Sequence, residues 1–311
     1  MKENAKPAFI RCIFIFELIK MSDIDGEWQV QRRRKGASKS LKSFQRCPSH
    51  CIEPLDVGKT LKRIRETVAE MRYEGFWKEW NEQMLAAVSL NQNDKEVSTG
   101  QQQESLDAKI CPLECVCYGL GTFSSCVSAR YQLAVLLLLL DAAMIPLKDC
   151  FVFDPAFSHG EKDVLRELGL TVLTDNEEGK RLATKPTLFY LMHCGKALYN
   201  NLLWKNWSPK CLPFVVIIGN SFGGMRERMI EREFKRDYSF ISQAVTMCEE
   251  RKLNCPSHLT DIFSDTALMT FNYSKINTLN QSTWTEPPEP HYQHCSDLEI
   301  IQKESQNGER T

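Results

Sequence analysis

The sequence predicts an α/β fold: a doubly wound, mostly parallel Rossmann-like sheet with an N-terminal helical extension and disordered termini. Between residues 110 and 275, short apolar runs alternate with longer helical segments, a pattern typical of βαβ units with right-handed crossovers. The strand candidates are continuously apolar, so helices should cover both faces of the sheet. The first strand leads directly into a glycine turn and a helix, an arrangement found in many nucleotide-binding folds.

The composition is that of an ordinary soluble globular protein, with 42% hydrophobic and 25% charged residues among 311. The net charge of -1 argues against a protein that mainly coats nucleic acid. The 13 cysteines are odd in number, and without a convincing signal peptide they indicate a reducing compartment and no disulfide framework. The apolar run Leu133–Leu140 is far shorter than the about 20 residues of a membrane span, so we expect it in a buried helix.

The chain divides by composition into five segments. The first contains the basic cluster Arg32-Arg33-Arg34-Lys35, which is either a nuclear import signal, a nucleic-acid contact or part of a solvated arm. In chain order the segments are a basic, mostly disordered arm (1–54), an amphipathic helical segment (55–90), a polar linker (91–109), the Rossmann-like domain (110–275) and a disordered tail (276–311).

The helical segment carries one apolar stripe, with a break expected at Gly75. Its apolar residues recur at spacings of three and four, as on one face of a helix. This stripe should pack on the core or on a partner protein. Its members are Leu61, Ile64, Val68 and Met71.

Turn residues separate the elements expected in the central domain. Six strands are predicted at Cys115–Tyr118, Cys150–Phe153, Leu170–Leu173, Thr187–Met192, Phe214–Ile218 and Ala267–Phe271. Five helices are predicted at Ser125–Ala143, Gly160–Leu168, Glu177–Ala183, Lys196–Trp207 and Met225–Lys235.

Polar or flexible residues follow several of these strands, at the edge of the sheet where open α/β folds bind ligands. This repeated placement is the main indication of function, because each residue alone is a weak signal. The candidate ligand-binding residues are Gly119, Gly121, Ser124 and Ser125 after the first strand, Asp154 after the second, His193 after the fourth, and Asn220 and Ser221 after the fifth.

The first turn should form the mouth of the site. Gly119 and Gly121 allow a sharp turn and a close approach, and Ser124 or Ser125 can cap the following helix, whose N-terminus suits a phosphate or carboxylate. Ser124 holds the position of the third glycine in the dinucleotide fingerprint. A tight strand–helix turn without a ligand would need the same glycines, so both interpretations stay open.

The remaining candidates also leave alternatives. Asp154 stands where a carboxylate would accept ribose hydroxyls, or else Asp154-Pro155 starts a turn. His193 is suited to ligand contact, to acid–base work or to a structural role. A His193–Cys194 base–nucleophile pair is disfavoured, because neighbours on a regular strand point to opposite faces. Asn220-Ser221 forms either a crevice loop or a helix cap.

We expect no metal site. Two groups of metal-ligating residues occur, but neither has a second pair at zinc-finger spacing. These groups are Cys47, His50 and Cys51, and His291, His294 and Cys295.

Several motifs together resemble the "sensitivity to red light reduced" (SRR1) family over about residues 21–275. Met192 departs from the family pattern, which has proline before the histidine. The matching motifs are Gly26-Glu27-Trp28, Tyr118-Gly119-Leu120-Gly121, Ser124-Ser125, the leucines from Leu136, Phe153-Asp154-Pro155, His193-Cys194 and Gly219-Asn220-Ser221-Phe222.

The resemblance implies an SRR1-like domain with a regulatory role. The family is associated with circadian-clock function and light signalling in plants, and with clock-gene expression and heme biosynthesis in animals and fungi. Cytoplasmic and nuclear locations would follow. The resemblance supplies no catalytic activity or ligand that can be carried over.

The leading hypothesis is therefore a regulatory protein, not an enzyme, which binds a nucleotide or another adenosine-containing ligand in the crevice. The alternatives are a transferase with an adenosine-containing cofactor and a scaffold with an empty crevice. Heme is a disfavoured ligand, although His193, Cys194 or Cys47-Pro48 could supply an axial group. Partners are expected to be unidentified regulatory proteins, without a membrane and without strong indications of direct nucleic-acid binding.

Overall fold

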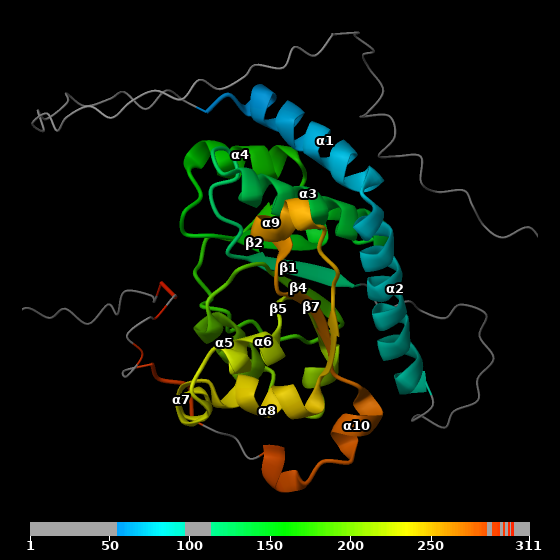
Figure 1. The fold of residues 1–311 in the computed structure, drawn as a ribbon, viewed down its shortest axis with the longest axis vertical. Coiled ribbons are helices and arrows are strands. Elements are labelled where there is room, and N and C mark those ends of the chain that lie inside the picture. The colour runs from blue at the N-terminus through cyan, green and yellow to red at the C-terminus, as the bar shows by residue number, and fades with distance from the viewer. Residues whose placement is uncertain are drawn as a thin grey trace, which may run out of the picture. The chain divides into compact units, whose positions relative to one another are not determined.

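A mixed seven-stranded sheet forms the centre of the fold (Figure 1). The computed structural model describes residues 55–96, 113–284, 288–292, 295, 298, 300 and 301. The strand order is β3-β2-β1-β4-β5-β7-β6. The strands are β1 (Glu114–Tyr118), β2 (Cys150–Phe153), β3 (Thr171–Val172), β4 (Thr187–Leu191), β5 (Val215–Asn220), β6 (Glu249–Lys252) and β7 (Thr266–Thr270).

The first five strands are parallel, whereas β7 runs antiparallel to both β5 and β6. The order 3-2-1-4-5 is that of a doubly wound sheet, and it reverses direction between β1 and β4. In such sheets, this switch point opens a crevice at the carboxyl ends of the strands. The α/β, Rossmann-like class predicted from the sequence is therefore confirmed.

Helices cover both faces of the sheet, as Figure 1 shows. Alternation along β1 sends Cys115 and Cys117 into one hydrophobic cluster and Val116 and Tyr118 into the other. The first cluster involves α1 (Val57–Tyr73), α2 (Gly75–Glu96), α3 (Val127–Ala142), α4 (His159–Glu167) and α9 (Thr260–Phe263). The second involves α5 (Lys196–Lys205), α6 (Phe222–Glu227), α7 (Glu231–Asp237), α8 (Ser239–Met247) and α10 (Tyr273–Asn277).

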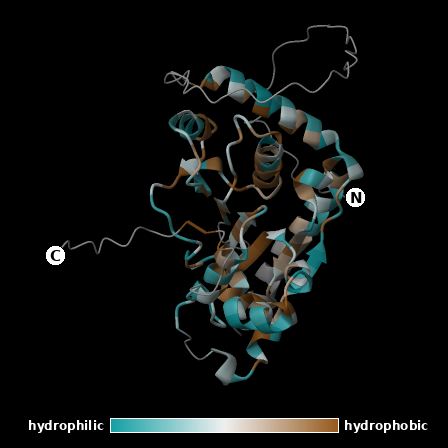
Figure 2. Ribbon diagram, turned by 60° about the vertical axis from the view of Figure 1, so that its left-hand side comes forward, coloured by the Kyte–Doolittle hydropathy of each residue, from teal (hydrophilic) through white to brown (hydrophobic). Residues whose placement is uncertain are grey.

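Apolar residues are concentrated on the strands in the middle of the fold, as Figure 2 shows. The leucine-rich run in α3 is part of this core, and Leu133, Leu136 and Leu140 are each fully buried. No helix in the described part of the chain is both long and apolar enough to cross a membrane. Short 3-10 turns complete the connections at Leu147–Asp149, Leu212–Phe214, Ser257–Leu259 and Gln281–Trp284.

The N-terminal helices pack on the core of the same fold. Leu61, Ile64 and Met71 of α1 are buried, and α1 lies against α3. The chain leaves the first helix after Tyr73, and a second helix begins at the expected break, Gly75. The second helix continues to Glu96, so the polar linker cannot begin at residue 91. No glycine or proline occurs between 91 and 96 to stop the helix.

Three other sequence predictions need correction. The helix expected at Glu177–Ala183 is a series of turns, because Glu178 and Gly179 have φ angles of 51° and 76°, which a right-handed helix does not allow. The helix expected at Met225–Lys235 is divided into α6 and α7. The charged edge strand β6 was not predicted, since its Glu-Glu-Arg-Lys sequence lacks β-prone residues.

The described part of the C-terminal segment is ordered, contrary to the prediction of a disordered tail from residue 276. Ile276 is fully buried, and Tyr292 is only 8% exposed. Tyr292 belongs to the second hydrophobic cluster, and its ring lies 6.0 Å from that of Tyr238. An aromatic side chain in a polar segment can therefore hold that segment on the core.

Replacing Trp80 tests whether the helical extension is part of the cooperative fold. Its ring is 1% exposed and lies 5.5 Å from the Phe263 ring, and Nε1 donates to the Asn254 carbonyl oxygen at 2.8 Å. We expect Trp80→Ala to lower the free energy of unfolding by about 3–5 kcal/mol in urea titrations. The control Tyr73→Ala removes a side chain that is 87% exposed. This control should change the free energy of unfolding by less than about 0.5 kcal/mol. Equally small effects would contradict the packing described.

Candidate functional site

A cavity of about 240 Å³ lies at the carboxyl ends of β1, β2 and β4, at the switch point of the sheet. Three of the predicted site residues line it, namely Gly119, Asp154 and His193. Other lining residues are Tyr118, Phe153, Pro155, Asn176, Gly179, Cys194, Gly195, Leu198, Ile300 and Ile301. The remaining predicted residues do not line this cavity: Gly121, Ser124, Ser125, Asn220 and Ser221.

The protein itself requires the two glycines of the first loop. Gly119 and Gly121 have φ angles of 67° and 77°, in the left-handed region that favours glycine. A Cβ atom on Gly119 would lie 2.6 Å from the Cys194 Sγ atom, which donates to the Tyr118 carbonyl oxygen at 3.3 Å. The loop after β4 thus approaches the loop after β1 closely, and this contact explains Gly119 without a ligand.

Asp154 braces the same loop. One carboxylate oxygen accepts from the Gly121 N–H at 2.7 Å, and the other accepts from the Ala156 N–H at 2.7 Å. The residue is 7% exposed. Each oxygen therefore accepts from one backbone donor, which supports the alternative that Asp154-Pro155 starts a turn.

The loop between β1 and α3 is bound by one of the protein's own carboxylates. Glu161, which is 1% exposed, accepts from the Ser124 N–H at 3.0 Å and Oγ at 2.8 Å with one oxygen. Its other oxygen accepts from the Ser158 N–H at 3.0 Å and Oγ at 2.9 Å. Burial acts to raise the Glu161 pKa, but these hydrogen bonds outweigh burial and lower it. The carboxylate is therefore ionised at neutral pH.

Neither serine caps the helix that follows. The N-cap of α3 is Cys126, which makes no capping side-chain bond, and Ser125 Oγ instead lies 3.3 Å from the Thr122 hydroxyl.

The sequence analysis did not identify Glu161, although a local sequence motif points to it. Ser158-x-x-Glu161 is a capping box at the start of α4, and its glutamate also reaches the neighbouring loop.

His193 lies in a turn after β4 with a φ angle of 53°, an uncommon backbone conformation that often marks functional sites. The argument against a His193–Cys194 base–nucleophile pair assumed that both residues lie on a regular strand. Because His193 lies in a turn, that argument no longer holds. Burial lowers the His193 pKa and the nearby Asp265 opposes this shift, so the imidazole is neutral at pH 7. Its Nδ1 lies 3.4 Å from the Gln132 Nε2 donor.

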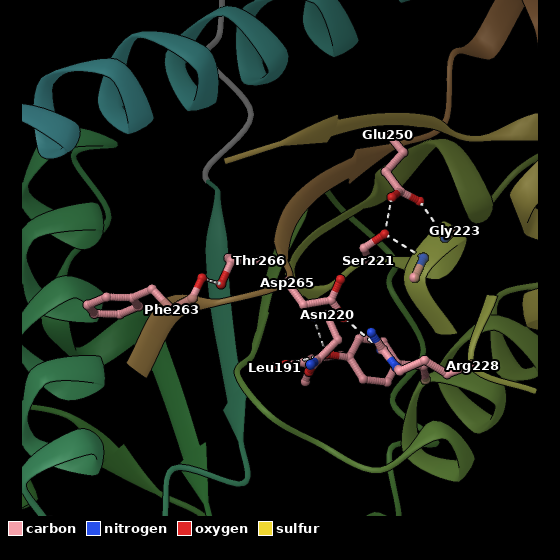
Figure 3. Close-up of polar contacts among 11 residues, drawn as sticks. Leu191, Asn220, Ser221, Gly223, Arg228, Glu250, Phe263, Asp265 and Thr266 are labelled. Atoms are coloured by element: carbon pink, nitrogen blue, oxygen red, sulfur yellow. Dashed lines mark hydrogen bonds and ion pairs between the residues drawn. The ribbon is translucent and has the colours of Figure 1, made fainter. Parts of the chain in front are cut away.

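Asn220 and Ser221 belong to a separate polar group at the end of β5, drawn in Figure 3. The Asn220 N–H donates to the Tyr199 hydroxyl at 2.8 Å. Ser221 caps α6 by accepting from the Gly224 N–H at 2.8 Å, and it donates to Glu250. The helix-cap alternative is therefore the one observed.

The same group contains Asp265 and Arg228, which the sequence did not suggest. Asp265 has a φ angle of 59°, and its Oδ2 lies 2.6 Å from Arg228 Nη2. Figure 3 shows this pair beside Asn220. Asp265 also acts on His193, where its charge opposes the lowering of the pKa by burial.

Among the residues that the structure describes, no group of three or more acidic, histidine or cysteine side chains could hold a metal ion. The candidate group Cys47, His50 and Cys51 lies outside the described residues, as does His294. Cys47 as an axial heme ligand therefore also lies outside them.

Two glycine substitutions separate backbone strain from the contact with Cys194. At Gly121 the nearest atom to a new Cβ is 3.7 Å away, so Gly121→Ala should cost only the left-handed strain of about 1–2 kcal/mol. Gly119→Ala adds the collision with Sγ, so urea unfolding should show a larger loss. Cys194→Ala should recover the excess in the Gly119→Ala background. Equal losses for the two glycines would show that the thiol simply moves aside.

Glu161→Gln should lower the free energy of unfolding at pH 7 by about 1.5–3 kcal/mol, since the amide nitrogen would face the Ser158 N–H donor. The loss in free energy of unfolding should be complete above the ordinary glutamate pKa of about 4.3. It should shrink as the pH falls through the lower pKa that Glu161 has in the folded protein. Urea titrations from pH 7 to pH 3 measure this. A difference independent of pH would contradict an ionised Glu161.

Comparison with known proteins shows relatives over much of the chain. The family model of the SRR1 domain matches residues 94–270. An SRR1-like protein of Mus musculus is 53% identical over 142 residues, which cover 45% of this chain and 57% of the mouse protein. The chain thus matches less than two thirds of the mouse protein's length.

More distant relatives match over longer stretches. An SRR1-like protein of Drosophila melanogaster is 32% identical over 204 residues, covering 65% of this chain and 68% of that protein. The Arabidopsis thaliana protein named SENSITIVITY TO RED LIGHT REDUCED 1 is 28% identical over 278 residues, covering 86% of this chain and 92% of that protein.

Among solved structures, the mitomycin 7-O-methyltransferase MmcR matches with a TM-score of 0.30 and 10% identity, over 70% of this chain and 67% of that one. This likeness is too weak to support an argument about function. The family model, in contrast, covers more than half of the sequence. The chain therefore belongs to the SRR1 family.

Proposed function

We propose that this chain is a regulatory protein that binds a nucleoside-type small ligand in the cavity at the switch point. The observation that carries the proposal is the position of the cavity, which opens where β1, β2 and β4 end and where doubly wound sheets bind ligands. The strained backbone of His193 on its wall adds to this.

The charges around the first loop favour a neutral or cationic ligand. A diphosphate usually binds the free N–H groups at the start of the helix after β1. Here two N–H groups of the loop before that helix already bind carboxylates: the Ser124 N–H binds Glu161, and the Gly121 N–H binds Asp154. A phosphate at this loop would lie near both carboxylates, so we expect adenosine or S-adenosylmethionine to fit better than NAD or ATP.

The side chains on the cavity wall favour binding over catalysis. General acid–base chemistry needs two groups with suitable pKa values that converge on the ligand. Among the described lining residues, burial lowers the pKa of His193, so its imidazole can act as a base, whereas the Asp154 oxygens already accept from backbone N–H groups. Burial and the neighbouring Glu177 raise the Tyr118 pKa far above the neutral range. A sensor of ligand concentration is thus the better supported role.

An adenosine-cofactor-dependent transferase is the second candidate. One specific observation favours it: the order 3-2-1-4-5-7-6 with an antiparallel β7 is also the strand arrangement of S-adenosylmethionine-dependent methyltransferases. Because one fold hosts many functions, this remains an analogy of architecture. Turnover of S-adenosylmethionine with an acceptor substrate would decide for the transferase.

In the cell, we assign the ligand-binding role to regulation of the circadian clock and of heme biosynthesis, in cytoplasm and nucleus. The support is membership of the SRR1 family, whose Arabidopsis thaliana relative is named for its reduced sensitivity to red light. Cells that lack the protein should regain normal clock-transcript rhythms and heme levels with the wild type, but not with a variant that cannot bind the ligand.

A thermal-shift series with the full chain tests ligand binding. Adenosine, S-adenosylmethionine, ADP, NAD and heme are each added to the wild type. Adenosine or S-adenosylmethionine should raise the unfolding midpoint, with about 2.7 kcal/mol of stabilisation at 100 times the dissociation constant. His193→Asn should reduce this shift, because asparagine tolerates the left-handed backbone while removing the imidazole.

Ser125→Ala is the matched control, since Ser125 belongs to the first loop but does not line the cavity; it should keep the full shift. A larger shift with NAD or ADP would contradict the charge argument. If only heme shifts the midpoint, and this shift disappears in His193→Asn, the ligand of the cavity would be heme and not a nucleoside. No shift with any compound would favour the scaffold alternative.

A further inference from the structure

The described residues of the C-terminal segment contact α5 and line the cavity. We call its described residues, 288–292, 295, 298, 300 and 301, the C-terminal strap. The strap has a firmly held part around Tyr292 and a distal end consisting of Leu298, Ile300 and Ile301. The distal end forms part of the cavity wall, through Ile300 and Ile301.

Tyr292 anchors the strap on α5. Its hydroxyl lies 2.7 Å from Asn201 Oδ1 and 3.1 Å from the Ala197 carbonyl oxygen, and it accepts from Asn200 Nδ2 at 3.2 Å. The ring is buried with Tyr238 in the second hydrophobic cluster. Losing this contact would leave buried polar groups without partners, which is costly.

An ion pair reinforces the anchored part. Lys180 Nζ lies 2.6 Å from Glu289 Oε1, and its other partner is Glu178. Both side chains are partly exposed, so the pair fixes the position of the strap more than it stabilises the fold.

The distal end is held much more weakly. The Ile301 carbonyl oxygen accepts from Asn176 Nδ2 at 2.6 Å, but the Ile301 residue is 62% exposed. Leu298 and Ile300 are only partly buried against the second cluster. Release of this end would leave the Tyr292 anchor in place.

Ile300 also lines two cavities. It lines the switch-point cavity of about 240 Å³ and a neighbouring cavity of about 340 Å³, which Lys180, Glu289 and Tyr292 also line. Sites for small molecules usually measure about 300–1,000 Å³, so the first cavity is small for a nucleoside.

We propose that the distal end of the strap is a tethered competitor that narrows the crevice and must be released before the ligand binds fully. The proposal rests on the function proposed above only for the identity of the site's ligand. The apparent dissociation constant then equals the intrinsic one divided by the fraction of molecules with the strap released. Any partner or modification that draws the strap away would therefore increase ligand affinity.

Cys194 provides a readout that needs no ligand. Its thiol is partly buried and lines the same cavity as Ile300 and Ile301. Alkylation of the full chain by N-ethylmaleimide, followed by digestion and mass spectrometry, gives the labelling rate of each cysteine. Exposed Cys126 serves as an internal reference for reagent activity. The buried Cys115, Cys117 and Cys150 report any global unfolding.

The double variant Ile300→Asp/Ile301→Asp places two carboxylates against an apolar wall and should speed labelling of Cys194 about tenfold. Asn176→Asp is a milder second variant. It keeps an oxygen to accept the Glu178 N–H but removes the donor to Ile301, and should give a smaller increase. The matched control Ile230→Asp changes an isoleucine that is 66% exposed and does not line either cavity.

The outcomes separate the two proposals. Faster labelling of Cys194 in both strap variants, with the three buried thiols still protected, supports the strap. If the double variant also binds adenosine or S-adenosylmethionine about tenfold more tightly, both proposals stand. Faster labelling without binding of either probe supports the strap and contradicts the ligand. Labelling of Cys194 at the wild-type rate in both variants would overturn the strap, whatever the binding result.

Discussion

The buried carboxylate of Glu161 joins the two loops on which the candidate site depends. It accepts hydrogen bonds from Ser124 in the loop after β1 and from Ser158 in the loop after β2. A charged acceptor that satisfies several donors in a buried place is stabilising only while all of its partners remain. The two loops are therefore held together before any ligand arrives, and the Ser124 donors of the first loop are satisfied by the protein itself.

This constraint explains the character of the cavity. Asp154 fixes the glycine loop from the β2 side, and Cys194 contacts it from the β4 side. What remains at the switch point is a small space with a neutral imidazole at His193 and aliphatic groups from the C-terminal strap. These features are the basis on which we propose a nucleoside-type ligand rather than a phosphate, and on which we propose that the C-terminal strap narrows the space.

The sequence was sufficient for the architecture because buried strands have a strong local signature. The continuous apolar run Cys150–Phe153 is the strand observed. Side-chain roles were less accessible, since they depend on pairs far apart in the chain. The sequence leaves Asp154 between a ligand and a turn because nothing near it in the chain shows the Gly121 N–H, and Tyr292 in a polar tail gives no sign of its partners on α5. His193 was placed at the cavity but not in its strained turn.

The central claim is that Glu161, and not a ligand, satisfies the donors of the first loop. Carboxyl-detected NMR titration of the full chain, with the Ser124 amide followed in parallel, measures it directly. The account predicts that Glu161 titrates below the ordinary value of about 4.3 and that the Ser124 amide resonance shifts with the same midpoint. An ordinary or raised Glu161 pKa, with a Ser124 amide that does not follow it, would contradict the account and leave the N–H open to a phosphate.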